Sequence, residues 1–299
     1  RSKVLGGFDA EYVPGWDCHG LPIEHQIEKQ HGRNLPADEV RKLCRTYVAE
    51  QVARQKKDFI RLGVLGDWDN PYLTMNFSAE ANEIRALGKM LEDGYLYQGL
   101  KPVNWCLDCR SALAEAEVEY EDKHSPAIDV AFEIHPNHAI TVAKAFGLDH
   151  LDGPAFAVIW TTTPWTLPGN RAISYSHKIE YGLFEVTANE RDFGPAVGEK
   201  YVLATKLAES VAASAKISLK QIGSVSADDL KATVCAHPLA GLGYHFKVPM
   251  LDGDHVTDDT GTGFVHTAPS HGREDFEIWM AYGRELSARG IETRIPFTI

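Results

Sequence analysis

Hydrophobic positions along the first part of the chain recur at the spacing of a helix. The apolar residues of segment 37–62 predict an amphipathic helix that is capped by Asp38 and ends before Gly63. A second helix is expected over 78–93, because Ser78 can cap its start and a glycine follows its end. Segment 95–106 is expected to form a strand pair around a turn.

From Ser125 onward the pattern changes to short β-type runs separated by turns. One helix is expected among them, over 206–214. The expected strands are 128–134, 156–160, 181–186, 201–204 and 264–266. We therefore divide the chain into a domain of residues 1–124 and a second, β-rich mixed domain of residues 125–299.

Composition fits two soluble globular domains. The chain has 299 residues, of which 44% are hydrophobic and 24% charged. No apolar run approaches the ~18 residues of a membrane span, so we expect no membrane association. The chain begins at Arg1 without an initiator methionine, and we expect it to be a fragment of a longer protein.

Charge and cysteine usage narrow the function. The net charge of −12 argues against bulk electrostatic binding of nucleic acid, so any nucleic-acid partner must be held by a local patch. The five cysteines are sparse and odd in number, which favours a reducing compartment, the cytoplasm. Cys106 and Cys109 have zinc-knuckle spacing, but no second pair follows, so they amount to half a zinc site; a redox dithiol is the alternative.

The segment "AFAVIWTTTPWTLPGN" places three threonines at the end of an apolar strand. Side chains alternate along a strand, so Thr161 and Thr163 are expected on one face and Thr162 on the other. The prolines that follow prevent a continuing central strand, and Trp165 is expected over the strand end. These hydroxyls either reflect β-propensity or position a water or a sugar hydroxyl.

The segment "DDTGTGFVHTAPSHGREDF" predicts a strand ending at His266, a tight loop and a helix with Asp275 in its first turn. The two residues are expected close together at the open end of the strand. The carboxylate either complements the helix dipole or binds an ammonium group, and the residues alone leave both readings open. Near the start, Cys18 and His19 are neighbours in "GWDCHG"; adjacent residues rarely serve one site, so we do not expect a cysteine nucleophile.

Five motifs together resemble the isoleucyl enzymes of the class I aminoacyl-tRNA synthetase family. They are "PGWDCHGLPIE", "GVLGDWDNPYLTM", "NWCLDCRSALAEAEVEYED", "WTTTPWTLPGNRAI" and "GTGFVHTAPSHGREDF". The resemblance implies an α/β and β-rich mixed fold. Residues 1–124 would be part of a Rossmann-type catalytic core with its connective segment, and residues 125–299 an inserted β-barrel-like editing domain, cut short at its C-terminal side. A valyl or leucyl relative is the alternative within the class.

The resemblance also implies an editing chemistry. One missing methylene gives little discrimination in a hydrophobic pocket, and the isoleucyl enzymes are the standard example, so a second site hydrolyses valyl adducts. Asp275 would anchor the substrate α-ammonium, and His266 would shape a pocket that admits valine and rejects isoleucine. The terminal adenosine, the ester and the water would be held by Thr161, Thr162 and Thr163. Trp165 and Asn170 would belong to the same wall.

For the rest of the enzyme, the resemblance implies a monomer that charges tRNA(Ile) and edits at the tRNA 3′ end. Asp17 resembles the residue that binds the isoleucine ammonium in the synthetic site. ATP and Mg²⁺ would serve the intact enzyme, whereas editing would need no cofactor. Neither a HIGH nor a KMSKS sequence occurs in the chain, so we expect no aminoacylation from it. The alternative is a fragment that only binds aminoacyl-adenosine.

Overall fold

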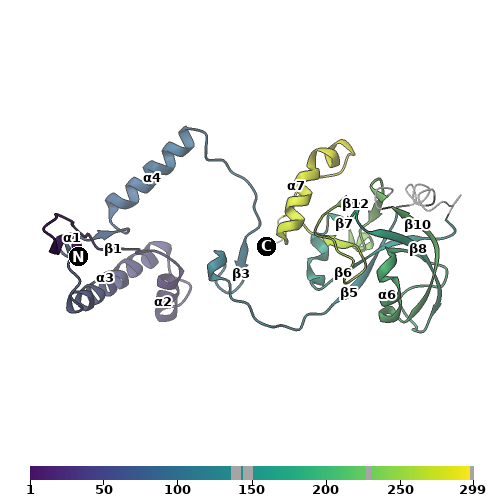
Figure 1. Cartoon of the computed structure of the whole chain (residues 1–299), viewed down its shortest axis with the longest axis horizontal. Helices are drawn as coiled ribbons and strands as arrows, with labels where there is room; N and C mark the ends of the chain where they lie inside the picture. The colour runs from purple at the N-terminus through teal and green to yellow at the C-terminus, as the bar shows by residue number, and fades with distance from the viewer. Residues whose placement is uncertain (136–142, 144–150, 227–229, 297–299) are drawn as a thin grey trace. The chain divides into compact units, whose positions relative to one another are not determined.

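The computed structural model describes residues 1–135, 143, 151–226 and 230–296. The chain divides into two compact units, Arg1–Gly99 and Leu100–Ile299, which are treated separately below (Figure 1). Residues 100–124 are thus grouped with the second unit, and the expected domain limits of 1–124 and 125–299 remain a prediction. Among the described residues, no helix is both long and apolar enough to cross a membrane.

The first unit consists mainly of helices. Its elements are α1 (Ser2–Leu5), β1 (Gly15–Trp16), α2 (Leu21–His31), α3 (Ala37–Arg61), β2 (Tyr72–Leu73) and α4 (Phe77–Glu92). The two helices predicted over 37–62 and 78–93 are confirmed as α3 and α4. Their predicted caps are wrong, because Pro36 and Asn76 occupy the N-cap positions and neither makes a side-chain cap hydrogen bond. Strands β1 and β2 pair in parallel.

A two-stranded hairpin opens the second unit. Strands β3 (Asn104–Cys106) and β4 (Ser111–Leu113) pair antiparallel, and the short 3-10 helix η1 (Glu115–Glu117) follows. The strand pair predicted inside 95–106 is wrong, since only its last three residues form a strand. Pro102 has no N–H to give to a strand ladder. The turn spans residues 107–110 instead, and it contains Arg110, whose φ of 54° is left-handed.

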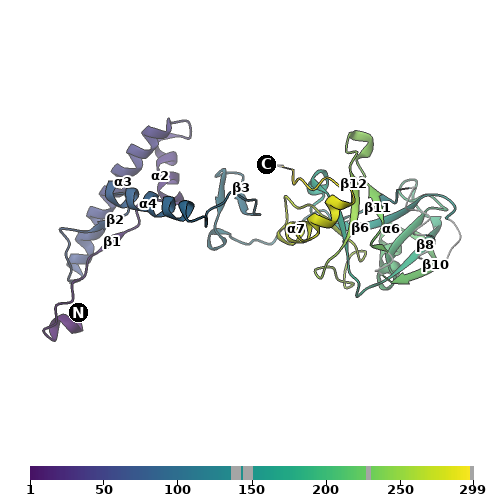
Figure 2. The same cartoon turned by 90° about the horizontal axis from the view of Figure 1, so that it is seen from above.

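A curled sheet of nine strands forms most of the described second unit (Figure 2). The strand order is β10-β8-β9-β6-β13-β7-β12-β11, and β5 pairs with the other edge of β6. The strands are β5 (Ile128–Glu133), β6 (Ala155–Thr161), β7 (Ala172–Tyr175), β8 (Glu180–Asn189), β9 (Lys200–Ala204), β10 (Ile217–Ser226), β11 (Val234–Ala236), β12 (Lys247–Asp252) and β13 (Val265–Thr267). A bridge between Ile134 and Cys235 joins the β5 end to β11, so this part of the sheet curls back on itself.

The inside of the curl is a hydrophobic core. Fully buried members include Phe132, Ile159, Ile173, Leu183 and Met250. Burial of such side chains supplies most of the folding free energy, at roughly 25 cal/mol per Å² of apolar surface. The five strands predicted between residues 128 and 266 are confirmed, each to within a few residues, as β5, β6, β8, β9 and β13.

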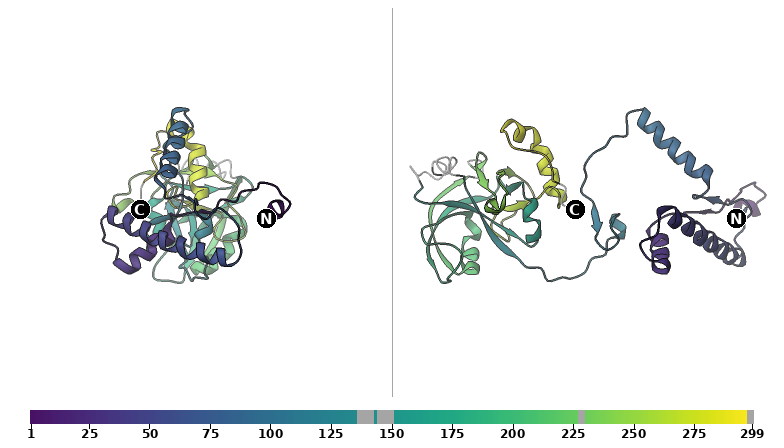
Figure 3. Two further views of the ribbon diagram at one scale, coloured as in Figure 1. Left: turned by 90° about the vertical axis from the view of Figure 1, so that its left-hand side faces the viewer. Right: turned by 180° about the vertical axis from the view of Figure 1, so that it is seen from behind.

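Helices α6 (Ala208–Ala215) and α7 (Arg273–Ala288) pack on the outside of the sheet (Figure 3). Helix α6 contributes Val211 to a cluster that includes residues of β8 and β9, and the 3-10 helix η3 (Thr205–Leu207) precedes it. Helix α7 buries Trp279 and Leu286 against Ala172 of β7 and Leu251 of β12. Packing on β7 places the first turn of α7 near the end of its neighbour β13.

Candidate editing site

Sheet pairing brings the two predicted motifs together. Strand β13 lies between β6 and β7, with Val265 opposite Trp160 in the parallel pair and His266 opposite Ile173 in the antiparallel pair. The end of β6 at Thr161 is therefore beside the strand that carries His266. The 3-10 helix η2 (Pro164–Gly169) starts directly after the threonines, with a proline in its first turn, a position where the missing N–H has no cost.

The threonine hydroxyls form a connected group at this strand end. The Thr163 N–H donates to Thr161 Oγ1 at 3.1 Å, and the two hydroxyl oxygens are 3.3 Å apart. The two side chains therefore meet as expected, although β6 ends at Thr161 and Thr163 lies outside the strand. The Thr166 hydroxyl donates to the Thr163 carbonyl at 2.8 Å, which links η2 to the same group.

His266 is buried between two polar side chains. Its Nε2 lies 2.8 Å from Thr166 Oγ1, and its Nδ1 lies 2.8 Å from Asn170 Nδ2. The Asn170 amide also donates to the Ala172 carbonyl, which fixes Nδ2 as the donor towards His266. The imidazole is therefore neutral, with the proton on Nε2 donated to Thr166. Burial, with a smaller effect of His237 and His271, lowers the pKa of His266 to about 4.

Asp275 lies in the first turn of α7 and is mostly buried. Its Oδ2 accepts the Ala268 N–H at 2.8 Å, so the carboxylate is fixed to the backbone two residues after His266. Burial raises the pKa of Asp275 to about 6, against the opposing effect of that hydrogen bond. A side chain at Gly272 would place its Cβ 3.1 Å from this carboxylate, so the carboxylate would have to shift by a few tenths of an ångström.

Two of the predicted site residues of the second unit, Thr162 and Trp165, are exposed, and a third, Asp17, belongs to the other unit. The Thr162 side chain is exposed, and its carbonyl accepts the Ser125 hydroxyl at 2.6 Å. Trp165 is 64% exposed, so it presents its ring to solvent from η2. Asp17 belongs to the first unit, where it is exposed and accepts the His19 N–H at 3.4 Å.

Cys106 and Cys109 lie on the β3–β4 hairpin. The Cys109 N–H donates to Cys106 Sγ at 3.2 Å, and such hydrogen bonds from Cys109 lower the pKa of the Cys106 thiol. Within the described ranges, no group of three or more His, Cys, Asp or Glu side chains is arranged to hold a metal ion. Two thiols alone do not fit the four ligands of a closed zinc site.

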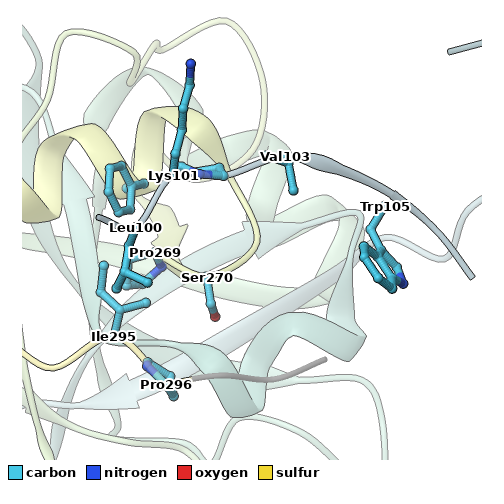
Figure 4. A pocket seen from close by; sticks show the side chains of 10 residues that line it. Leu100, Lys101, Val103, Trp105, Pro269, Ser270, Ile295 and Pro296 are labelled. Atoms are coloured by element: carbon cyan, nitrogen blue, oxygen red, sulfur yellow. The ribbon is translucent and has the colours of Figure 1, made fainter. Parts of the chain in front are cut away.

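An apolar pocket of about 360 Å³ lies beside the loop that joins β13 to α7 (Figure 4). Pro269, Ser270 and Phe276 line one side of it, and Ile295 and Pro296 add to the lining. Opposite are Leu100, Lys101, Pro102 and Val103 of the extended segment before β3, together with Trp105 of β3. No predicted site residue lines this pocket, so it is separate from the threonine–histidine group.

Thr166 and His237 were not among the residues selected from the sequence. Thr166 follows Thr163 by three positions across a proline, and this 3-10 spacing was a usable signal. His237 comes from beyond β11 and hydrogen-bonds the η2 backbone at Leu167, 70 residues earlier. No local pattern indicates that contact.

Comparison with known proteins gives the same family along most of the chain. Residues 1–281 match the family described as tRNA synthetases class I (I, L, M and V). The chain is 62% identical over 283 residues to an isoleucine–tRNA ligase of Dechloromonas aromatica (strain RCB), covering 95% of this chain and 29% of that protein. It is 54% identical over 305 residues to the isoleucine–tRNA ligase of Agrobacterium fabrum (strain C58 / ATCC 33970), covering 100% of this chain and 30% of that protein.

Among solved structures, the crystal structure of GlLeuRS-CP1 is similar at a TM-score of 0.42 and 15% identity, over 56% of this chain and 66% of that chain. The chain spans about 30% of the length of the curated relatives it matches. The family match covers nearly all of the chain. The chain therefore belongs to the class I tRNA synthetases of the I, L, M and V group.

Proposed function

We propose that the second unit hydrolyses valine from mischarged valyl-tRNA(Ile), as the editing site of an isoleucine–tRNA ligase. The intact enzyme would activate isoleucine with ATP and Mg²⁺, charge tRNA(Ile), and work as a cytoplasmic monomer. Residues 1–124 would belong to its Rossmann-type core, with Asp17 on the isoleucine ammonium, and residues 125–299 to its editing domain. High identity to proteins named isoleucine–tRNA ligase supports this proposal.

Asp275 would bind the α-ammonium group of the substrate. With a pKa of about 6, the carboxyl group is mostly ionised at neutral pH despite its burial. Among the described residues, its one side-chain hydrogen bond uses Oδ2, so Oδ1 remains to accept from an ammonium group. A buried carboxylate near a helix N-terminus is well suited to hold a cation and weakly suited to take a proton.

His266 would act as a fixed wall of the side-chain pocket. Both ring nitrogens are already hydrogen-bonded, one as donor and one as acceptor, so neither is free to take a proton from water. A ring held from both sides cannot turn away from a larger side chain. Isoleucine would then be rejected because its side chain is too large for the pocket. Asn170, which hydrogen-bonds the ring, and the exposed Trp165 of η2 would belong to the same wall.

The threonines would position the terminal adenosine, the ester and the attacking water. Thr161 Oγ1 already accepts a backbone N–H, which leaves its O–H to donate, and the Thr163 side chain is exposed to a ligand. The water oxygen attacks the ester carbon, the bond to the ribose oxygen breaks, and the water proton passes to that oxygen. The products are free valine and uncharged tRNA.

The observation that carries the proposal is the fixed neutral His266 beside the backbone that holds the Asp275 carboxylate. The test measures deacylation of valyl-tRNA(Ile) and isoleucyl-tRNA(Ile) by the 299-residue chain and by its Asp275→Ala variant. We expect loss of valine alone, abolished in the variant. Equal rates on both substrates, or a fully active variant, would refute the assigned roles.

A second candidate is a fragment that binds aminoacyl-adenosine without turnover. The observation in its favour is that the chain spans about 30% of its relatives' length. It predicts that a non-hydrolysable valyl-adenosine analogue raises the melting temperature while neither tRNA is deacylated. Loss of that thermal shift in Asp275→Ala would still locate the ammonium site.

A further inference from the structure

His237 is a buried residue directly after β11 and is fixed in one tautomer. Its side chain is only 2% exposed. The Leu239 N–H donates to Nδ1 at 3.1 Å, so Nδ1 is an acceptor and the proton is on Nε2. The Nε2–H then donates to the Leu167 carbonyl of η2 at 2.9 Å. Burial lowers the pKa of His237 as well, which agrees with a neutral ring.

The same carbonyl receives a second donor. The Asn170 N–H reaches the Leu167 oxygen at 2.9 Å, which ends η2. Leu167 therefore lies between Thr166 and Asn170, the two residues that hold the two nitrogens of His266. A displacement of this carbonyl moves both partners of the His266 ring together.

An aromatic cluster surrounds the His237 ring. Its ring centroid lies 6.2 Å from Phe132, 5.1 Å from Tyr244 and 4.8 Å from Phe246. The Arg171 guanidinium stacks over Phe246 at 3.9 Å and donates to the Asn170 carbonyl at 2.9 Å. The cluster thus fixes the end of η2 from two directions, through His237 and through Arg171.

We propose that His237 is a positioning residue that sets the location of the His266 wall, and with it the discrimination between valyl and isoleucyl esters. This inference rests on the proposed editing function. His237 does not touch the substrate group in this proposal; it acts through Leu167, Thr166 and Asn170. Pockets that discriminate by one methylene depend on such fixed walls, because a small displacement admits the larger side chain.

The test combines a spectroscopic signature with a selectivity ratio. In the 299-residue chain labelled with ¹⁵N-histidine, long-range ¹H–¹⁵N spectra report the tautomer of each ring. In His237→Phe, which keeps an aromatic ring but loses the donor, we expect the His266 signal to change from pure Nε2–H to a mixture. The ratio of valyl to isoleucyl deacylation should fall about ten-fold, the scale of one lost hydrogen bond.

His237→Gln is the rescue variant, because its amide can donate to Leu167 and accept from Leu239; we expect wild-type spectra and ratio. His245→Phe makes the same change at a nearby exposed residue and should alter neither. If His237→Phe fails to fold, His237→Asn replaces it, since its shorter amide reaches only the Leu239 partner and should reproduce the loss.

Two outcomes would overturn the inference. One is a folded His237→Phe, or Asn, whose His266 signal and selectivity match the wild type. The other is a His237→Gln that loses the His266 signal as His237→Phe does. A wild-type chain without deacylation would defeat the proposed function instead, and the His266 spectra would still decide whether His237 positions that ring.

Discussion

Thr166 and His266 are joined by a buried hydrogen bond of 2.8 Å, although 100 residues separate them in the chain. The Thr166 hydroxyl donates its hydrogen bond to the Thr163 carbonyl, so its oxygen accepts from His266. Thr166 thereby connects His266 to the threonines at the end of β6. Both nitrogens of the His266 ring are hydrogen-bonded, which holds the ring in one orientation, although the buried Oδ1 of Asn170 has no hydrogen-bond partner among the described residues.

Replacing Thr166 by valine should destabilise the second unit. Valine keeps the shape but leaves the His266 Nε2–H and the Thr163 carbonyl without this partner, and an unsatisfied buried group costs about 1–3 kcal/mol. Urea unfolding gives the free energy directly. The control is Thr162→Val, whose hydroxyl is exposed, for which we expect a change within about 0.5 kcal/mol. Equal losses in the two variants would contradict the network.

His266 should make stability fall in acid. Its pKa of about 4 in the folded state is below the ordinary value of 6.5, so folding favours the neutral ring. This contribution to the free energy of unfolding is fully present above about pH 6.5. It is lost as the pH falls through 4, and its full size is about 3 kcal/mol. His266→Gln lacks this titration. Urea unfolding at several pH values should show the gap between wild type and variant narrowing in acid; a constant gap would contradict the assignment.

Asp275 should have the opposite dependence. Its folded pKa of about 6 lies above the ordinary value of 3.8, so the folded state favours the protonated acid. That contribution is present below about pH 4 and is lost as pH rises through 6. Asp275→Asn can still accept the Ala268 N–H, and at neutral pH it should be more stable than wild type by about 2 kcal/mol.

The two Asp275 measurements belong together. If Asp275→Asn gains stability at neutral pH but loses valyl-tRNA deacylation, the carboxylate is kept at a cost to stability for function, as expected for a site residue. Glu274→Gln, an exposed neighbour in the same turn, is the matched control. A variant less stable than wild type at neutral pH would show that the charge is satisfied in the folded state.

The cysteines should differ in reactivity. Hydrogen bonds from Cys109 lower the pKa of Cys106, whereas complete burial raises that of Cys235. Because the thiolate is the reactive form, iodoacetamide at neutral pH should modify Cys106 well before Cys235 in the folded chain. Peptide mass spectrometry over a time course measures this. Simultaneous modification of both would contradict the described environments.

Local patterns predicted what depends on local chemistry. Helical spacing predicted α3 and α4. The contact between the Thr161 and Thr163 side chains was also expected, although Thr163 lies beyond the end of β6. The predicted strand pair over 95–106 was wrong, because the hairpin turn follows Cys106 and is closed by the backbone hydrogen bond from the Arg110 N–H to the Cys106 carbonyl. Strand pairing decided the rest: His237 reaches η2 only because β11 joins the curled sheet, which spacing within a segment cannot reveal.

The single β5–β11 bridge and the short pairing of β6 with β13 have a consequence for synthesis. Contacts between segments this far apart in sequence form late, after most of the loop-closure entropy has been spent. The ribosome must pass His266 before the imidazole that hydrogen-bonds Thr166 exists. A chain that ends between Thr166 and His266 carries the threonine hydroxyls but neither His266 nor Asp275. The group formed by the hydroxyls, His266 and Asp275 is therefore complete only when the chain through Asp275 has been made and has folded.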